Sequence, residues 1–216
     1  MAMFESTVTE IEQLAPSVLQ ITVSIHGQGF QFKPGQWLNF KFPEGISRAY
    51  TIASAPERSQ AVQLCVRRGP GKAGALLEKL EAGATVVVEG PHGDFVLPQD
   101  GRGVVFLAGD TGIAPVRSIT LHMLATQDAR PIFVLYEPDQ RHILYAADFD
   151  PLARSGQIVH ESGPIEGLIA RNRSALLAST VMAAGFEPFL ERSREALERI
   201  GFDPSALIVE SFGPQP

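Results

Sequence analysis

The chain has 216 residues, of which 44% are hydrophobic and 19% are charged, and its formal net charge is −6 at pH 7. These values indicate a globular protein with length for one large domain or two small ones, and the negative charge argues against a nucleic-acid partner. No apolar run is long enough to span a membrane, and the first residues lack the pattern of a signal peptide, so we expect a cytoplasmic protein. Cys65 is the only cysteine, which excludes an internal disulfide or a cysteine-ligated metal cluster, and the five histidines have no ligand-like spacing, so we predict no metal.

The first hundred residues read as short strands, rich in β-branched and aromatic residues and separated by turn-forming clusters. The predicted strands cover residues 6–14, 17–25, 35–42, 48–54, 61–68 and 85–90. Six strands at this short spacing predict an antiparallel β-barrel. One helix is expected at 72–83, where Leu76, Leu77 and Leu80 share a face.

The second half alternates strand and helix. Strands are expected at 103–110, 131–138, 157–162, 178–185 and 206–212, and helices at 115–127, 143–155 and 187–201. This alternation predicts a parallel sheet covered by helices on both sides. We therefore expect a β-barrel domain at 1–98 and an α/β domain at 103–216, divided within Leu97–Gly103, with a cleft between them that suits a cofactor.

The stretch FLAGDTGIAPVRSI is the sharpest local signal of the second half. A buried strand ends at Ala108, Gly109 and Gly112 permit a tight turn, and Pro115 suits the start of a helix. Backbone N–H groups at that start would attract an anion such as a dinucleotide pyrophosphate. An ordinary strand-to-helix turn would have the same residues, and the motif is not the GxGxxG fingerprint.

A second candidate anion site lies in VRRGPGKAGALL. Arg67, Arg68 and Lys72 surround a glycine-rich turn that leads into the short helix. A solvated turn with basic residues is the equally good alternative. The further turn GPHGDF contains His92, which we interpret as a loop residue rather than an acid–base group.

Taken together, these motifs resemble the ferredoxin–NADP reductase superfamily, and the resemblance covers nearly the whole chain. The matching motifs are PGQW at 34–37, R-x-Y-T at 48–51, G-x-x-G at 71–74, G-P-x-G at 90–93, G-x-T-G-x-A-P at 109–115 and E-x-F at 210–212. The subgroup most similar in motif is that of bacterial flavin reductases and oxygenase reductase modules. Relatives there often carry an additional iron–sulfur domain, which these residues do not include.

The resemblance implies a flavin along the R-x-Y-T strand. Arg48 would neutralise a flavin phosphate, Tyr50 would pack along the flavin, and Thr51 would hydrogen-bond near the hydride-accepting N5. Because side chains alternate along a strand, Thr51 would need its backbone N–H or a local twist to reach N5. The neighbouring Ala49 and, on the next strand, Val66 complete this candidate set. A surface ion pair for Arg48 and a half-buried core position for Tyr50 are the structural alternatives.

The resemblance also implies a pyrophosphate site at the short helix. Backbone N–H groups of Lys72, Ala73 and Gly74, after Gly71, would hold the flavin pyrophosphate, with Arg67 or Lys72 adding charge. The family usually has Ser or Thr where Gly74 stands. Loss of that hydroxyl removes about 1.5–3 kcal/mol of hydrogen bonding to a charged acceptor. The flavin could therefore bind weakly, or exchange as a substrate.

Three departures from the family pattern concern the dinucleotide. The expected pyrophosphate loop consists of Gly109, Asp110, Thr111 and Gly112, in which the carboxylate replaces a glycine. Ala184 replaces the cysteine of the C-G-x-x-P motif, which predicts a slower reaction rather than none. Glu137 and Asp139 follow the second strand of the α/β domain and would repel a 2′-phosphate, whereas Arg141 would act in the opposite direction.

The expected function is therefore that of an oxidoreductase using FAD (or FMN) and NADH or NADPH, with NADH favoured. Glu210 near the nicotinamide side, Thr51 and the adjacent Phe212 are given supporting roles, because hydride transfer needs stacked rings and no general base. The expected electron acceptor is an iron–sulfur protein, an oxygenase or free flavin. Release of reduced flavin, a non-catalytic flavin-binding or redox-sensing module, and an unrelated protein without flavin are the alternatives.

Overall fold

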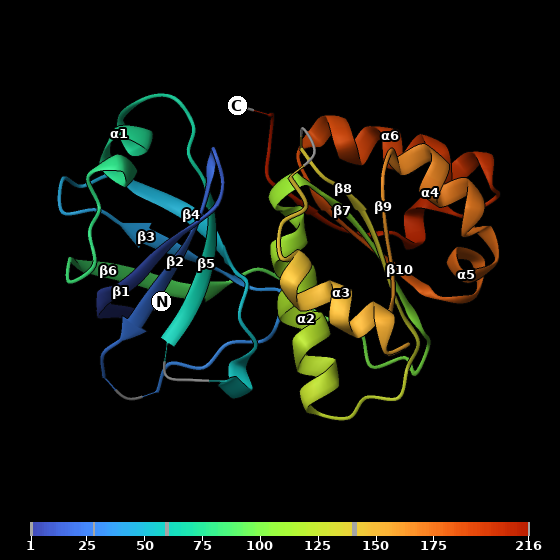
Figure 1. The fold of residues 1–216 in the computed structure, drawn as a ribbon, viewed down its shortest axis with the longest axis horizontal. Helices are drawn as coiled ribbons and strands as arrows, with labels where there is room; N and C mark the ends of the chain where they lie inside the picture. Colours follow the sequence, from blue (N-terminus) through green and yellow to red (C-terminus); the bar gives the residue numbers. More distant parts are fainter. Residues whose placement is uncertain (1, 28, 59–60, 140–141, 216) are drawn as a thin grey trace. The chain divides into compact units, whose positions relative to one another are not determined.

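The computed structural model describes residues 2–27, 29–58, 61–139 and 142–215, so Arg141 lies outside the described residues. Contacts divide the chain into two units. The first consists of the residues up to Leu97 together with Arg117–Thr126, and the second of Pro98–Val116 with Gln127–Gln215. Each unit has its own sheet (Figure 1).

The first unit is a closed barrel of antiparallel strands. Its strands are β1 (Met3–Ala15), β2 (Val18–Ile25), β3 (Trp37–Lys41), β4 (Ser47–Ile52), β5 (Ala61–Arg67) and β6 (Thr85–His92), with η1 (Pro56–Arg58) and α1 (Lys72–Glu78) between them. They pair in the order β1-β2-β5-β4-β3-β6, and β6 closes on β1. The predicted six-stranded antiparallel barrel is confirmed. The short helix ends earlier than expected, because Glu81–Gly83 form a turn before β6.

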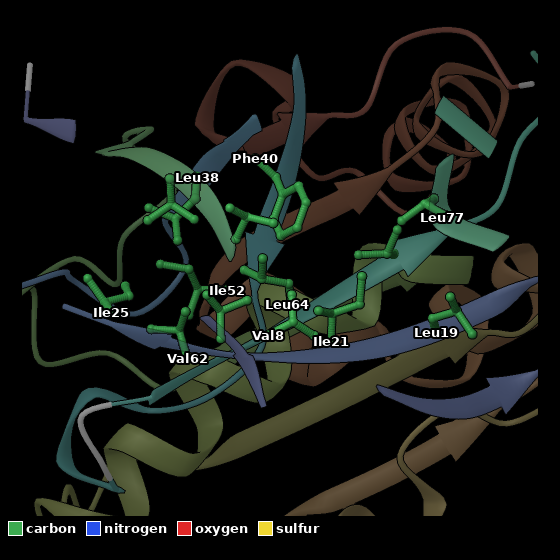
Figure 2. Close-up of a cluster of buried hydrophobic side chains, with 14 of the residues drawn as sticks. Val8, Leu19, Ile21, Ile25, Leu38, Phe40, Ile52, Val62, Leu64 and Leu77 are labelled. Carbon is green, nitrogen blue, oxygen red and sulfur yellow. The ribbon is translucent and has the colours of Figure 1, made fainter. Parts of the chain in front are cut away.

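The barrel is filled by alternate side chains of its strands. Leu38 and Phe40 of β3 and Leu64 of β5 are fully buried, and Leu77 of α1 packs into the same cluster (Figure 2). Burying each such side chain contributes about 1.5–3 kcal/mol. The period-two pattern that predicted the strands is therefore the pattern of this core.

The PGQW motif fixes three strands at one end of the barrel. Gly35 has φ of +97°, and an added Cβ there would overlap the carbonyl of Phe95. The Gln36 side chain donates to the Gly93 carbonyl (3.0 Å), while its backbone carbonyl accepts from Ile52 N–H (3.0 Å). The motif thus joins the start of β3 to the end of β4 and to the turn after β6.

The second unit contains a parallel sheet of five strands in the order β11-β10-β7-β8-β9. Its strands are β7 (Val104–Gly109), β8 (Ile132–Glu137), β9 (Val159–Ser162), β10 (Thr180–Gly185) and β11 (Ile208–Ser211). Every residue of β7 and of β10 is buried, as their uninterrupted apolar sequences predict. The predicted parallel α/β sheet is confirmed.

Helices connect these strands. They are η2 (Asp110–Gly112), α2 (Ile113–Ala125), α3 (Ala146–Arg154), α4 (Ile165–Arg171), α5 (Arg173–Ala178), α6 (Glu187–Arg199) and η3 (Pro204–Ala206). α4 and α6 pack against each other and cover part of the sheet. The sequence predicted neither α4 nor α5, which are short and adjoin at Asn172. α2 begins two residues before Pro115, which the first helical turn tolerates because its N–H groups need no intrahelical partner.

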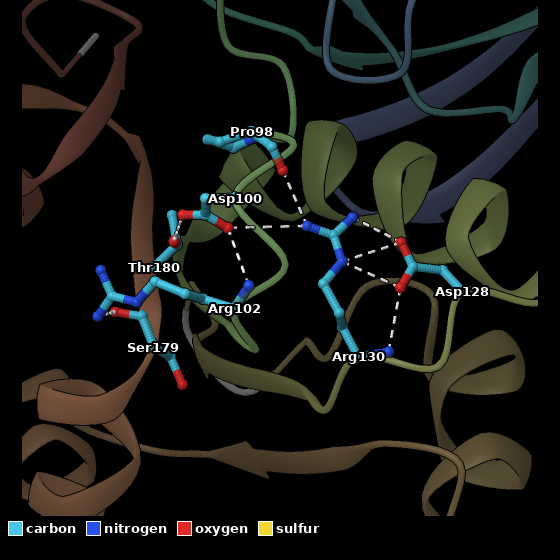
Figure 3. Close-up of polar contacts among 7 residues, drawn as sticks. All are labelled: Pro98, Asp100, Arg102, Asp128, Arg130, Ser179 and Thr180. Carbon is cyan, nitrogen blue, oxygen red and sulfur yellow. Dashed lines mark hydrogen bonds and ion pairs between the residues drawn. The ribbon is translucent and has the colours of Figure 1, made fainter.

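Polar contacts hold the segment before β7 within the second unit (Figure 3). Arg130 donates to the Pro98 carbonyl (2.8 Å) and forms an ion pair with Asp128. Thr180 donates to Asp100 (2.5 Å), and this bond, with that from the Arg102 backbone, lowers the pKa of the Asp100 carboxyl. The segment Leu97–Gly103, expected as a boundary, is therefore tied to the α/β unit from Pro98 onward.

Candidate functional site

In the closed barrel, β4 leaves part of one backbone edge unpaired, and we call this unpaired stretch the opening. β4 pairs with β3 over its first five residues, but with β5 only at Thr51 and Ile52. Residues 47–50 therefore present one edge of their backbone away from any neighbouring strand. Unpaired N–H and C=O groups on such an edge are available to a ligand.

Two side chains of the R-x-Y-T motif lie along this opening and differ in burial. Arg48 is exposed and donates only to the carbonyl of Ser47 (2.8 Å) among the contacts described for it. Tyr50 is half-buried beside Phe40, with ring centroids 5.9 Å apart. Burial raises the pKa of Tyr50 to about 12, although the charge of Arg48 opposes the shift. The phenol is thus a neutral hydrogen-bond donor over the physiological range, and the guanidinium is accessible to an anion.

Thr51 faces the opposite side of β4, as the alternation predicts. It is 8% exposed and lies opposite Trp37 of β3, which in turn lies opposite His92 of β6. The Trp37 and His92 rings are 4.5 Å apart, and an added Cβ at Gly93 would contact the indole at 2.9 Å. His92, which the sequence analysis placed in a loop, is the last residue of β6, and its ring packs against Trp37.

The loop that enters α1 fits closely around its glycines. Gly71 precedes the helix with φ of +89°, a conformation that favours glycine. An added Cβ at Gly74 would overlap the carbonyl of Gly69. The loop therefore leaves no space for a side chain at position 74. Ala73 and Gly74 are buried, so these two residues could meet a phosphate only through their backbone N–H groups.

The basic residues beside this loop divide into two kinds. Arg67 donates to the Ser17 hydroxyl (2.8 Å), and Arg68 donates to the Pro16 carbonyl, so both bind the turn between β1 and β2. Lys72 is exposed at the first position of α1. Val66 is fully buried in the barrel core, which leaves only its backbone for a ligand. Lys72 is thus the accessible cation of the turn.

A second glycine-lined turn lies at the carboxyl ends of β7 and β10, where the strand order of the parallel sheet reverses. An added Cβ at Gly112 would overlap the carbonyl of Ala184, and one at Gly109 would overlap the Phe189 ring. Gly185 ends β10 with φ of +155°. Neither Gly109 nor Gly112 has a positive φ: close approach of the turn to β10 explains Gly112, and close approach of Phe189 of α6 explains Gly109. In doubly wound sheets, the crevice outside these strand ends is where nucleotides bind.

Asp110 occupies a glycine-like conformation in this turn. Its φ is +52°, in the left-handed region, where side chains other than those of Asn and Asp are strained. Aspartate and glycine are therefore both compatible with this backbone conformation. Thr111 next to it is 4% exposed.

The residues expected near a nicotinamide meet at the ends of β10 and β11. Glu210 lies directly opposite Ala184 across this strand pair. Phe212 N–H donates to the Gly185 carbonyl (2.9 Å), and its ring packs edge-on against Phe186 at 5.9 Å. Glu210 is half-buried. Sequence motifs separated by more than 20 residues thus converge on one edge of the sheet.

The sequence analysis missed the function of two polar residues in α2. Arg117, 7% exposed, donates to the Ala53 carbonyl (2.8 Å) and to the Gln63 side chain (2.9 Å). Ser118 donates to the Ser54 carbonyl (2.7 Å). These bonds fix the segment that follows the R-x-Y-T strand. The signal in the sequence was a charged residue, Arg117, within a mostly apolar helix.

A charge cluster, also missed, lies at the end of β8. Arg192 of α6 forms ion pairs with Glu137 and with Glu166 (3.1 Å), and Glu137 also accepts from Ile165 N–H (2.8 Å). Within the described ranges, no group of three or more His, Cys, Asp or Glu could hold a metal ion. Among the same residues, no helix is both long and apolar enough to cross a membrane.

Comparison with known proteins agrees with this geometry. Residues 5–97 match the family model of the oxidoreductase FAD-binding domain. The chain is 35% identical over 158 residues to ferredoxin–NADP reductase B of Sorangium cellulosum, covering 70% of this chain and 65% of the relative. It is 31% identical to the ferredoxin–NAD(+) reductase component of the alkene monooxygenase system of Xanthobacter autotrophicus, covering 85% and 58%.

A solved structure shows the same fold. The Amycolatopsis cytochrome P450 reductase superposes with a TM-score of 0.87 at 23% identity, over 99% of this chain and 70% of that one. The chain spans less than two thirds of the length of the curated relatives described above. The closed barrel followed by a parallel five-stranded sheet is the fold shared with that structure. The predicted resemblance to the ferredoxin–NADP reductase superfamily is confirmed.

Proposed function

We propose that the chain is an FAD-dependent oxidoreductase that takes a hydride from NADH or NADPH and passes electrons to an external acceptor. The observation that carries this proposal is the open edge of β4, with exposed Arg48 beside it, in a barrel that matches an FAD-binding family. We assign the flavin to the barrel, residues 1–98, and the dinucleotide to the α/β unit, residues 103–216. The relatives named as reductases of ferredoxins and oxygenases support an acceptor protein of that kind.

The chain's own residues would bind and orient the flavin. Arg48 offers an exposed charge to a phosphate, and the N–H groups at Lys72–Gly74 offer neutral donors to the pyrophosphate. The neutral Tyr50 phenol packs along the open edge and would donate to a ligand oxygen. Thr51 and the unpaired backbone of residues 47–50 would hydrogen-bond the ring edge.

The dinucleotide would be held by the second glycine-lined turn. Gly109 and Gly112 let this turn pack closely against Phe189 and Ala184 at the strand ends, where its backbone N–H groups could meet a pyrophosphate. Glu210 and Phe212 would orient the nicotinamide and exclude water. When bound, the flavin supplies the redox chemistry, accepting a hydride and releasing electrons singly or as a pair. We favour NADH over NADPH because Glu137 ends β8 and shares Arg192 with a second carboxylate, Glu166 of α4.

An absorption experiment tests this function. Purified protein is loaded with FAD or FMN, dialysed, and mixed anaerobically with NADH or NADPH. We expect a flavin spectrum that bleaches with at least one dinucleotide. If the bound flavin stays oxidised with both dinucleotides, the oxidoreductase function is rejected and a non-catalytic binding or sensing module is favoured. Protein that binds neither flavin would reject the flavin site itself.

A second candidate function is the release of reduced flavin as a product. The absence of space for a hydroxyl side chain at Gly74 favours it, because one potential phosphate ligand is missing. Dialysis separates the two functions. Flavin retained through dialysis supports a bound prosthetic group, whereas complete loss with continued reduction of added flavin supports the exchangeable substrate.

A further inference from the structure

The charge cluster at the end of β8 consists of Glu137, Glu166 and Arg192, which belong to three different elements. Arg192 Nη1 lies 3.2 Å from Glu137 Oε2 and 3.1 Å from Glu166 Oε1, and its Nη2 donates to Glu137 Oε1. Ile165 N–H gives Glu137 a further bond of 2.8 Å. Most of the acceptor sites of the Glu137 carboxylate are therefore used inside the protein. It would act on a ligand mainly through its charge.

The cluster has two carboxylates for one guanidinium, which is a net charge of −1. A backbone hydrogen bond, and then the bond from Arg192, lower the pKa of Glu166, and the bond to Glu137 raises the pKa of Arg192. Glu166 and Arg192 therefore remain ionised near neutral pH. The side chains of Arg192 and Glu166 are 44% and 39% exposed, so a ligand can approach them.

The place of the cluster in the sheet matters for a dinucleotide. β8 lies next to β7, whose carboxyl end carries the glycine-lined turn. In doubly wound folds, residues following the second strand meet the adenosine ribose, and they read its 2′ position. NADH has a hydroxyl at this position, whereas NADPH has a phosphate of charge about −1.5 to −2 near pH 7.

We propose that the cluster makes this ribose subsite selective for NADH, and that Arg192 is a specificity-determining residue. Glu137 and Glu166 keep its guanidinium from a 2′-phosphate and add a repulsive charge. An arginine freed from them would instead bind phosphate through paired N–H groups. This inference rests on the proposed dinucleotide function, and goes beyond it by naming the residues that choose the coenzyme.

The test measures binding rather than turnover. Dissociation constants of NAD⁺, NADP⁺, 5′-AMP and adenosine 2′,5′-bisphosphate are determined by calorimetry on FAD-loaded wild type, Glu166→Gln and the double variant Glu137→Gln/Glu166→Gln. Glutamine at 137 keeps an acceptor for Ile165 N–H. We expect NADP⁺ affinity to rise about tenfold per charge removed at low salt, with NAD⁺ affinity within about threefold. The selectivity should weaken as salt is added.

Two controls make the result specific to Arg192. Adding Arg192→Gln to the double variant should abolish the gained NADP⁺ affinity, because the phosphate ligand is gone. Arg199→Gln removes an exposed arginine of the same helix, paired with Glu195, and should change the selectivity much less, because its charge acts on Glu166 only as the weakest of the causes that lower that pKa. If Glu137→Gln impairs folding, Glu166→Gln alone should still shift the ratio.

The outcomes separate this inference from the proposed function. The inference alone would be overturned if the wild type binds NAD⁺ and the glutamate variants keep its ratio of NADP⁺ to NAD⁺ dissociation constants to within twofold. An equal shift in Arg199→Gln would also overturn it. Wild type that binds neither dinucleotide would overturn both the inference and the proposed function.

Discussion

Charge and packing are divided between neighbouring residues of β4. Arg48 is exposed and contributes little packing, whereas Tyr50 contacts the barrel core through Phe40. Ligand binding and stability should therefore respond to different substitutions on one strand. Arg68 differs from Arg48 in this respect. Its described hydrogen bond is to the backbone of the β1–β2 turn, so we expect it to contribute to stability more than to ligand binding.

Arg48→Ala should weaken flavin binding by about 10- to 100-fold, because one charge-assisted bond to phosphate contributes about 1.5–3 kcal/mol. The melting temperature of the flavin-free protein should barely change, since the side chain is exposed. Flavin fluorescence titration and thermal denaturation measure the two effects. Arg68→Ala is the matched control and should lower stability more than affinity. Equal losses in both measurements for Arg48→Ala would indicate a structural role instead.

Asp110→Gly should tighten dinucleotide binding, because a carboxylate beside a pyrophosphate is repulsive. The free energy of unfolding should stay within about 1 kcal/mol of the wild-type value. Glycine removes the backbone strain at φ of +52°, but its greater flexibility in the unfolded chain offsets this gain. Calorimetry with NAD⁺ measures the affinity. Asp110→Asn tolerates the same backbone and removes only the charge, so it should give most of the gain. Unchanged affinity in both variants would show that this carboxylate does not affect the pyrophosphate.

At the scale of elements, the turn between β7 and α2 depends on close approach to β10. The Ala184 carbonyl occupies the space that a side chain at Gly112 would need, and the Phe189 ring occupies that at Gly109. Both contacts cross from one element to another. The two glycines therefore allow the turn to pack closely against β10 and α6.

Gly112→Ala should destabilise the protein by about 1–3 kcal/mol, since the overlap is with backbone and cannot be relieved by a rotamer change. Dinucleotide binding should fall as well, because the turn must move. Urea denaturation and calorimetry measure the two effects. Gly167→Ala in α4 is the matched control, where the nearest atom is the flexible Arg171 Nη1 at 3.4 Å. Its stability should be unchanged or higher, and a similar loss in both variants would refute the steric explanation.

At the scale of the whole molecule, stability in acid depends on groups buried in the α/β unit. The His160 side chain is 6% exposed and packs on Phe149 with ring centroids 5.2 Å apart. Burial lowers the pKa of His160, although Asp150 opposes the shift. Its Nε2 has no hydrogen-bond partner among the described residues. The folded protein therefore favours the neutral ring.

The free energy of unfolding should fall as pH decreases below about 6.5, where the unfolded chain binds a proton that the folded state resists. The contribution is fully present above that pH, and is lost as pH falls toward the lowered pKa of the folded state. Urea denaturation at pH 7.5, 6.5 and 5.5 measures it. His160→Asn should flatten this part of the profile, with His26→Asn as an exposed control. An unchanged slope in His160→Asn would assign the acid sensitivity to other groups.

The sequence by itself determined the elements and much of the candidate site. Hydrophobic periodicity and turn residues predicted the barrel strands, the parallel strands and most helices. This works because the side chains of a strand or helix face the core at a regular spacing along the chain. The positions of Arg48, Gly71 and Gly112 followed from motifs only a few residues long. Each is a local property of the chain, so neighbouring residues are enough to reveal it.

Only the tertiary structure decided which polar groups meet. Arg67 binds Ser17 across 50 residues, Arg117 binds Gln63 across 54, and Arg192 binds Glu137 across 55. The same holds for the opening between β4 and β5, and for the carbonyl that excludes a side chain at Gly74. Such contacts depend on strand order and on which helices pack together. Hydrophobic periodicity in the sequence predicts whether a residue is buried. It does not predict which distant residue packs against it.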